Sequence, residues 1–215
     1  MNSTAVVVFV LVWIAIGLIT GLWMARRGHS STWTLIAVIL GPLFVPIAFE
    51  RAERRPVLAA AGPEGAEPVE STATSTEPRL LIGLDGSAES ELALDAALDL
   101  MGNRCGSVIL AEVVSYDDAG ESASGSEVAE ASDRLANAAS RVVGVRTNYE
   151  VLAGPPGEAL RQFAEEQGVD LLVVSRRGRG LSKRLMGSVS ADLVQHAKVP
   201  VLVIEPQQAG QVPPL

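Results

Sequence analysis

The sequence has little cysteine and little basic charge. Cys105 is the one cysteine among 215 residues, so the chain can form no internal disulfide and no metal site built on several thiolates. The formal net charge is -8, and residues 79–205 contain 12 Lys and Arg against 19 Asp and Glu. A domain that binds nucleic acid over a broad surface needs the opposite balance. The composition therefore argues against nucleic acid as a partner, and any site for an anion has to be local.

Two common phosphate-binding motifs are also missing. The chain contains no GxxxxGK[ST] sequence, which excludes a P-loop, and no GxGxxG sequence follows the first predicted strand of its C-terminal domain, which excludes the dinucleotide fingerprint. Basic residues are nevertheless concentrated in one segment, SRRGRGLSKRLMGS at 175–188, where five Lys and Arg side chains alternate with glycines.

Charge is absent from two apolar stretches near the N-terminus. Residues 5–24 contain no charged side chain, and a helix of that length spans roughly 30 Å, the thickness of a bilayer core. Residues 33–49 are also uncharged but contain Pro42 and Pro46, which fits either a kinked span or a re-entrant segment. A cleaved secretory signal is the alternative, but the chain begins without the basic side chains typical of one. We therefore expect a transmembrane helical hairpin over residues 1–55.

Basic residues flank this hairpin at both ends. Arg26 and Arg27 lie in the connection between the apolar stretches, and the second stretch is followed by Arg51, Arg54 and Arg55. The positive-inside rule then favours both termini in the cytoplasm. A single span with a re-entrant loop would instead place the N-terminus on the opposite side of the membrane and keep the C-terminal domain in the cytoplasm. Either way we predict a protein of the cell membrane, with the lipid bilayer as a partner and the C-terminal domain in the cytoplasm.

A segment of low apolar content separates the hairpin from the rest of the chain. Residues 56–78 hold four prolines and four glutamates, and their large apolar residues are Val57, Leu58 and Val69. Such a segment buries too little surface to offset the entropy of ordering it, so it is expected to be a disordered tether with a reach on the order of 25 Å. Residues 207–215 are expected to form a tail.

Residues 79–206 alternate between strand-like and helix-like patterns. The continuous apolar character of the strand-like runs is typical of a parallel sheet covered on both faces, and apolar residues spaced by three and four predict helices between them. Together they indicate an open doubly wound α/β fold, in which ligands bind beyond the carboxyl ends of the strands. The predicted strands are 80–84, 108–114, 145–153, 171–174 and 201–204, and the predicted helices lie near 94–101, 126–142, 160–164 and 189–197.

The first predicted strand ends at a possible ligand-binding residue. Asp85 could accept hydrogen bonds from a sugar hydroxyl or a base amine. Alternatively, Asp85 and Gly86 form a turn in which Ser87 caps the next helix.

The basic segment follows the fourth predicted strand. Gly178 leaves room for the backbone to approach a ligand, and Gly187 and Ser188 open a helix whose first amides favour an anion. The alternative is a solvated surface loop with a serine cap.

LLIGLDGSAESELALDAAL and DLLVVSRRGRGLSKRLMGSVSADLVQHAKVPVLVIEP resemble the universal stress protein domain, and the likeness covers residues 79–206. The resemblance implies a five-stranded sheet of order 3-2-1-4-5, of the adenine-nucleotide alpha-hydrolase-like class, and a homodimer formed through the last strand. In one branch of the family it also implies binding of ATP, with Mg²⁺ accompanying it, through a G-x2-G-x9-G-[ST] loop. The nucleotide contacts implied are Asp85, Val113, Gly178, Gly187, Ser188 and Val189, with Arg177 and Arg179 as further candidates for phosphate.

Two functions follow as alternatives. The first is a membrane-tethered nucleotide-binding regulatory module in the stress response. The second is a dimeric signalling or adaptor protein of the same fold that binds no nucleotide. Ser175 favours the second because it replaces the first glycine of the motif, as does the spacing of eight rather than nine residues between Gly178 and Gly187. An enzyme is less favoured, and at most a slow ATP hydrolysis is expected, because neither a general base nor a metal cluster can be identified.

Overall fold

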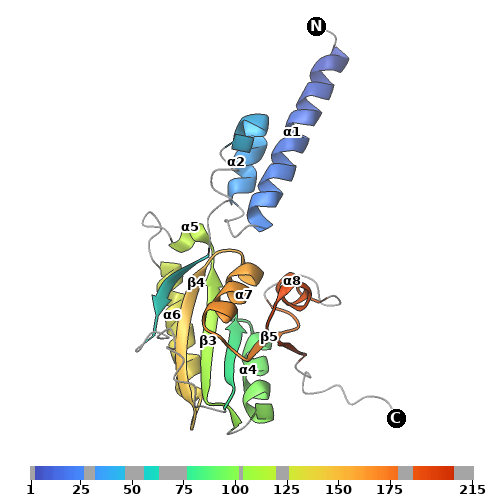
Figure 1. Ribbon diagram of the computed structural model, residues 1–215. Coiled ribbons are helices and arrows are strands. Elements are labelled where there is room, and N and C mark those ends of the chain that lie inside the picture. The colour runs from blue at the N-terminus through green and yellow to red at the C-terminus, as the bar shows by residue number, and fades with distance from the viewer. Residues whose placement is uncertain are drawn as a thin grey trace, which may run out of the picture.

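The computed structural model describes residues 3–26, 32–46, 56–62, 77–101, 104–119, 126–178 and 186–205. It consists of a pair of N-terminal helices and an α/β domain (Figure 1). In the pair, α1 spans Ser3–Arg26, and α2 spans Thr32–Leu40 and continues into the 3-10 helix η1, Gly41–Leu43. Helices therefore form in both apolar stretches, whereas their crossing of a membrane stays a prediction.

Small residues bring the backbones of α1 and α2 into contact. A Cβ added at Gly17 would overlap the carbonyl oxygen of Ala37, and one at Gly21, a turn later, would lie 2.7 Å from the Cα of Thr34. Trp13 Nε1 donates a hydrogen bond to the carbonyl of Ile39 at 3.2 Å and so joins the middle of α1 to the end of α2. The pair is held together by close backbone packing along one seam.

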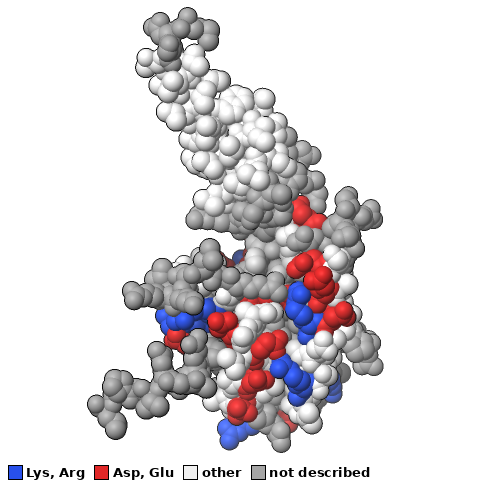
Figure 2. Space-filling view, turned by 180° about the vertical axis from the view of Figure 1, so that it is seen from behind, with Lys and Arg blue, Asp and Glu red and all other residues white. Residues whose placement is uncertain are grey.

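The remaining surface of the pair is apolar and exposed. Phe9 is 63% exposed, Ile19 70% and Ile39 77%. Seen from behind, the described surface of the pair shows no charged residue, whereas both signs of charge cover the domain (Figure 2). Judged by length and apolarity together, none of the helices in the described stretches qualifies as a membrane span.

The domain is built on one sheet of six strands in the order β1-β4-β3-β2-β5-β6. The five strands from β2 to β6 are parallel. Numbered from one to five along the chain, they lie across the sheet in the order 3-2-1-4-5, which confirms the predicted topology. Their bounds are β2 Arg79–Leu84, β3 Ser107–Val114, β4 Arg146–Ala153, β5 Leu171–Ser175 and β6 Val201–Ile204.

Helices cover both faces of the sheet, as a doubly wound fold requires. One face packs on α4 and α6, which contribute Leu94 and Leu135 to its core, and the other packs on α7 and α8, which contribute Phe163 and Leu193. The helix bounds are α4 Ala88–Met101, α5 Tyr116–Ala119, α6 Ser126–Arg141, α7 Pro156–Glu166 and α8 Ser188–His196.

The predicted tether over residues 56–78 is wrong at its beginning, and the sheet has six strands instead of five. Strand β1, Val57–Ala61, pairs antiparallel with β4, placing Val57 opposite Ala153 and Ala61 opposite Glu150. The amide of Gly62 extends the ladder to the carbonyl of Tyr149 at 2.8 Å. Without β1, the edge of β4 would carry a row of unpaired backbone groups. Residues 63–76 and the predicted tail at 207–215 lie outside the described residues.

The direction of β1 fixes where the helical pair joins the domain. Because β1 is antiparallel, its first residue lies beside the carboxyl end of β4, the edge at which all the parallel strands end. Ten residues, 47–56, lie between the last helical residue of the pair, 46, and β1. Even fully extended, such a connection reaches at most about 35 Å. The helical pair therefore stays near the carboxyl edge of the sheet, where Figure 1 places it.

Candidate functional site

A cavity of about 550 Å³ opens at the carboxyl ends of β2, β3 and β5. Its walls come from the residues that end these strands, from the start of α7 and from the start of α8. The cavity lies where the chain turns from one half of the sheet to the other, since β2 has β3 on one side and β5 on the other. Open α/β sheets bind ligands at such a position.

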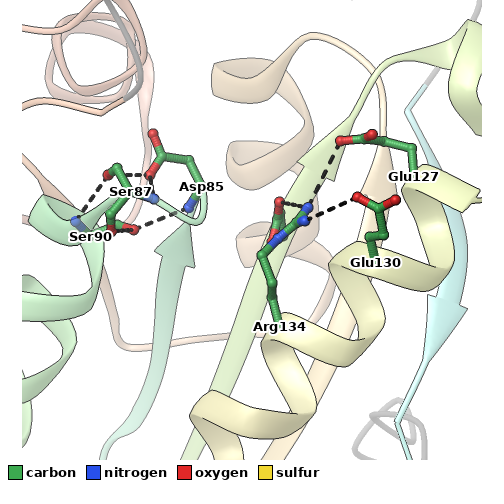
Figure 3. Close-up of polar contacts among 7 residues, drawn as sticks. Asp85, Ser87, Ser90, Glu127, Glu130 and Arg134 are labelled. Atoms are coloured by element: carbon green, nitrogen blue, oxygen red, sulfur yellow. Dashed lines mark hydrogen bonds and ion pairs between the residues drawn. The ribbon is translucent and has the colours of Figure 1, made fainter.

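The turn after β2 positions Asp85 at this cavity (Figure 3). Asp85 Oδ1 accepts hydrogen bonds from the amide and the hydroxyl of Ser87, at 3.0 and 2.5 Å. Ser87 Oγ in turn accepts one from the amide of Ser90 at 3.2 Å, which caps α4. Gly86, between them, has φ 71, a left-handed conformation suited to glycine. The predicted capping turn is confirmed, and the same turn fixes the carboxylate at the cavity wall.

The other oxygen of Asp85 lies against Gly178, which follows β5. A Cβ added at Gly178 would overlap Asp85 Oδ2. No side chain fits at Gly178 unless the carboxylate moves. The glycine therefore leaves room for the Asp85 carboxylate beside the end of β5, the strand that pairs with β2.

Backbone hydrogen bonds join the end of β5 to the start of α8. The carbonyl of Arg176 accepts one from the amide of Gly187 at 2.9 Å and one from Ser190 Oγ at 3.0 Å. Gly187 is the N-cap residue of α8, so the helix begins at the cavity wall. The amides in the first turn of a helix lack carbonyl partners within the helix and carry partial positive charge, which favours an anion there.

Ser175, which departs from the glycine motif, directs its hydroxyl to the loop backbone. Its Oγ donates a hydrogen bond to the carbonyl of Arg177. Arg177 lines the cavity, and its guanidinium forms an ion pair with Glu205 at 2.8 Å. The serine thus takes part in holding the loop that carries Arg177.

Most of the predicted site residues line this one cavity: Asp85, Val113, Arg177, Gly178, Gly187, Ser188 and Val189. Arg179 lies outside the described residues. That these residues contact a nucleotide stays a prediction, because their positions alone do not identify a ligand. In the described part of the chain, no group of three or more His, Cys, Asp or Glu is placed to hold a metal ion.

Sequence reasoning missed a charged pair beside the cavity. Glu112 lines the cavity and is 3% exposed, and both of its oxygens accept hydrogen bonds from Arg134 of α6, at 2.6 and 3.2 Å. Glu127 and Glu130 lie 3.9 and 3.8 Å from the same guanidinium (Figure 3). The one signal in the sequence is a glutamate inside the apolar strand SVILAEVV, because a buried charge needs a partner.

This network keeps Arg134 charged. The hydrogen bond to Glu112 raises the pKa of Arg134 above its usual value, while partial burial acts against the rise, and the charges of Glu112, Glu127 and Glu130 add to it. The contribution of a raised arginine pKa to stability is lost only above that pKa, so it does not vary around neutral pH.

The sequence profile of the universal stress protein family matches residues 78–205. The chain belongs to the universal stress protein family. Universal stress protein Rv1636 of Mycobacterium tuberculosis is 30% identical over 146 residues, which cover 58% of this chain and 94% of that protein. Matches to relatives from Synechocystis and Methanocaldococcus jannaschii span only 41% and 37% of those proteins.

A solved universal stress protein shares the fold of the domain, and further solved structures match it more weakly. The MJ0577 protein of Methanocaldococcus jannaschii is 23% identical with a TM-score of 0.56, and the match covers 63% of this chain and all of that one. A universal stress protein solved in complex with cAMP is 29% identical with a TM-score of 0.45, covering 62% of this chain and all of its own. Matched relatives from Archaeoglobus fulgidus and Arabidopsis thaliana were solved with dAMP and AMP.

Replacing Arg134 is predicted to destabilise the domain. Arg134→Gln leaves the buried Glu112 carboxylate without its bidentate partner, so the free energy of unfolding should fall by about 1–3 kcal/mol. The matched control is Arg141→Gln on the same helix, whose ion pair with Glu91 is exposed and should contribute less than about 1 kcal/mol. Urea denaturation measures both, and equal losses would contradict a special role for the Glu112 pair.

Proposed function

We propose that the cavity binds an adenine nucleotide and that the universal stress protein domain is a nucleotide-binding regulatory module. The observation that carries the proposal is the contact between Asp85 and Gly178 beside the start of α8. One cavity therefore contains both a fixed carboxylate, which can accept hydrogen bonds from sugar hydroxyls, and helix amides, which can donate them to phosphate. The volume of about 550 Å³ is in the range typical of small-molecule sites.

Each part of a nucleotide has a counterpart in the cavity wall. Val113, at the end of β3, offers an apolar surface for the base, and Asp85 can accept hydrogen bonds from the ribose hydroxyls. The amides of Ser188 and Val189, together with Arg177, suit the phosphates. Mg²⁺ would accompany ATP through the phosphate oxygens, as it commonly does. The role in the stress response rests on membership of the family.

Gly178→Ala tests this assignment. The new methyl group displaces the Asp85 carboxylate, so a lost charge-assisted hydrogen bond to the ribose should lower affinity about 10- to 100-fold. Isothermal titration calorimetry of the full chain with ATP, ADP and AMP measures the effect. We expect a similar loss of nucleotide affinity for Gly187→Val, because a side chain at this position would crowd the carbonyl of Arg176 at the start of α8.

The matched control is Gly62→Ala, since a Cβ at Gly62, which follows β1, overlaps the ring of Tyr149 on β4, outside the cavity. The nucleotide affinity of Gly62→Ala should equal that of the unmodified chain. Unchanged affinity in Gly178→Ala, or no heat from the unmodified chain at millimolar nucleotide, would reject the assignment.

We also propose that the N-terminal helices tether the domain to the cell membrane, with the domain in the cytoplasm. Support comes from the uncharged residues 5–24, from the exposed apolar side chains of α1 and from the close packing at Gly17 and Gly21. Helix pairs in lipid commonly pack through small residues, because lipid supplies little apolar driving force between helices. The basic residues after α2 favour the cytoplasmic orientation.

Alkaline washing of cell membranes checks the tether. The unmodified chain should stay in the membrane pellet, whereas Leu11→Asp should release part of it, because an aspartate near the centre of a span costs about 2.5–3.5 kcal/mol. Leu100→Asp is the matched control, since Leu100 of α4 is 65% exposed against 61% for Leu11 and lies in the domain. Complete release of the unmodified chain would disprove the tether.

A second candidate function is a dimeric adaptor that pairs through β6. It is favoured by the sheet edges, since β1 covers one edge and, among the described residues, β6 has β5 as its one strand partner. The carbonyls of Pro200 and Ile204 accept hydrogen bonds from the amides of Leu172 in β5 and of Arg176, which follows β5, at 3.0 and 2.7 Å. Because a ladder alternates, the amide of Val203 points away from β5, toward the open edge.

Val203→Pro tests whether the chain forms a dimer through β6. The proline removes an outward amide while leaving the ladder to β5 intact, so cross-linking in membranes should give a dimer for the unmodified chain and much less for the variant. Val203→Ala keeps the amide and should cross-link normally. A chain that yields no cross-linked dimer would rule out the adaptor.

A further inference from the structure

Two arginines at the cavity share one carboxylate of the chain itself. Arg176 and Arg177 both line the cavity, and both guanidinium groups form ion pairs with Oε1 of Glu205, which follows β6. Glu205 is not itself a lining residue, so its carboxylate pairs with two arginines of the cavity wall from outside the wall. Glu205 is 52% exposed at its side chain, so water screens these ion pairs.

The backbone holds this arrangement in place. The amide of Arg176 donates to the carbonyl of Ile204, the residue before Glu205, at 2.7 Å. The carbonyl of Arg176 accepts from Gly187 and Ser190, as described above. The arginines, the glutamate and the start of α8 are thus fixed by one set of hydrogen bonds, and the charged groups can exchange partners without rearranging the fold.

Arg177 also has a donor that its ion pair with Glu205 does not use. Its Nε is buried and has no hydrogen-bond partner among the described residues. A guanidinium can hold a carboxylate or a phosphate with the same donors. The Cα of Arg177 lies 3.7 Å from a Cβ built on Gly187, so the loop that carries this guanidinium adjoins the first turn of α8. Glu205 and a phosphate would then compete for the same arginine.

We propose that Glu205 is an internal competitor for the phosphate groups of the ligand and thereby sets how strongly the cavity prefers phosphorylated adenosines over adenosine itself. The proposal rests on the nucleotide-binding function proposed above. The carboxylate occupies the arginines in the absence of ligand and repels the negative charge of an incoming phosphate. Glu205 therefore lowers affinity for phosphorylated ligands and leaves affinity for the uncharged nucleoside unaltered.

Glu205→Gln in the full chain tests the proposal. The amide keeps the size of the side chain but removes its charge, so affinity for AMP, ADP and ATP should rise about two- to tenfold, while affinity for adenosine stays the same. The gain should shrink in high salt, which screens exposed charges. Titration calorimetry with adenosine and the three nucleotides measures both effects. Glu165→Gln, which removes an ion pair with Lys198 outside the cavity, should change nothing.

Arg177→Gln completes a double-mutant cycle. In the Glu205→Gln background it should cancel the gain in nucleotide affinity, whereas in the unmodified chain it should have a smaller effect, because Glu205 already occupies the arginine. Nucleotide affinity that is unchanged or lower in Glu205→Gln, or an equal rise for adenosine, would overturn the competitor proposal and leave the nucleotide site standing. Absence of binding by both the unmodified chain and Glu205→Gln would overturn both.

Discussion

The contact between the Asp85 carboxylate and Gly178 is the constraint on which the site depends. Strand pairing places the end of β2 beside the end of β5, where the chain passes from one half of the sheet to the other, and the missing side chain at Gly178 leaves room there for the carboxylate. One carboxylate oxygen is held by Ser87, and the other faces the glycine. The geometry of the cavity wall therefore follows from a helix cap on one strand and a missing side chain on the next.

Charges around the cavity are balanced by partners from distant parts of the chain. Arg134 of α6 neutralises Glu112 at the end of β3, and Glu205 after β6 pairs with Arg176 and Arg177 after β5. The first pair is mostly buried and the second is exposed. Buried partners stabilise the wall of the cavity, whereas exposed partners can be displaced by a ligand at little cost. The ion pair of Glu112 thus stabilises the cavity wall, whereas the ion pairs of Glu205 can compete with a ligand for the arginines.

The sequence predicts the parallel sheet well because its strands are buried on both faces and read as continuous apolar runs. Strand β1 escapes prediction because Val57 and Leu58 are exposed and are followed by three alanines, so burial gives no pattern, and its pairing with β4 joins residues about ninety positions apart. Asp85 and Gly187 are predictable because local capping motifs mark them. The partners of Glu112 and Arg177 are not, because a charge in the sequence does not reveal which distant side chain it meets.

The most direct test of the account is a structure of the full chain determined at saturating adenine nucleotide. The account predicts the base beside Val113, the ribose within hydrogen-bond distance of Asp85 and the phosphates at the amides of Ser188 and Val189. A nucleotide bound elsewhere on the chain, or a cavity that holds none at saturating concentration, would contradict it.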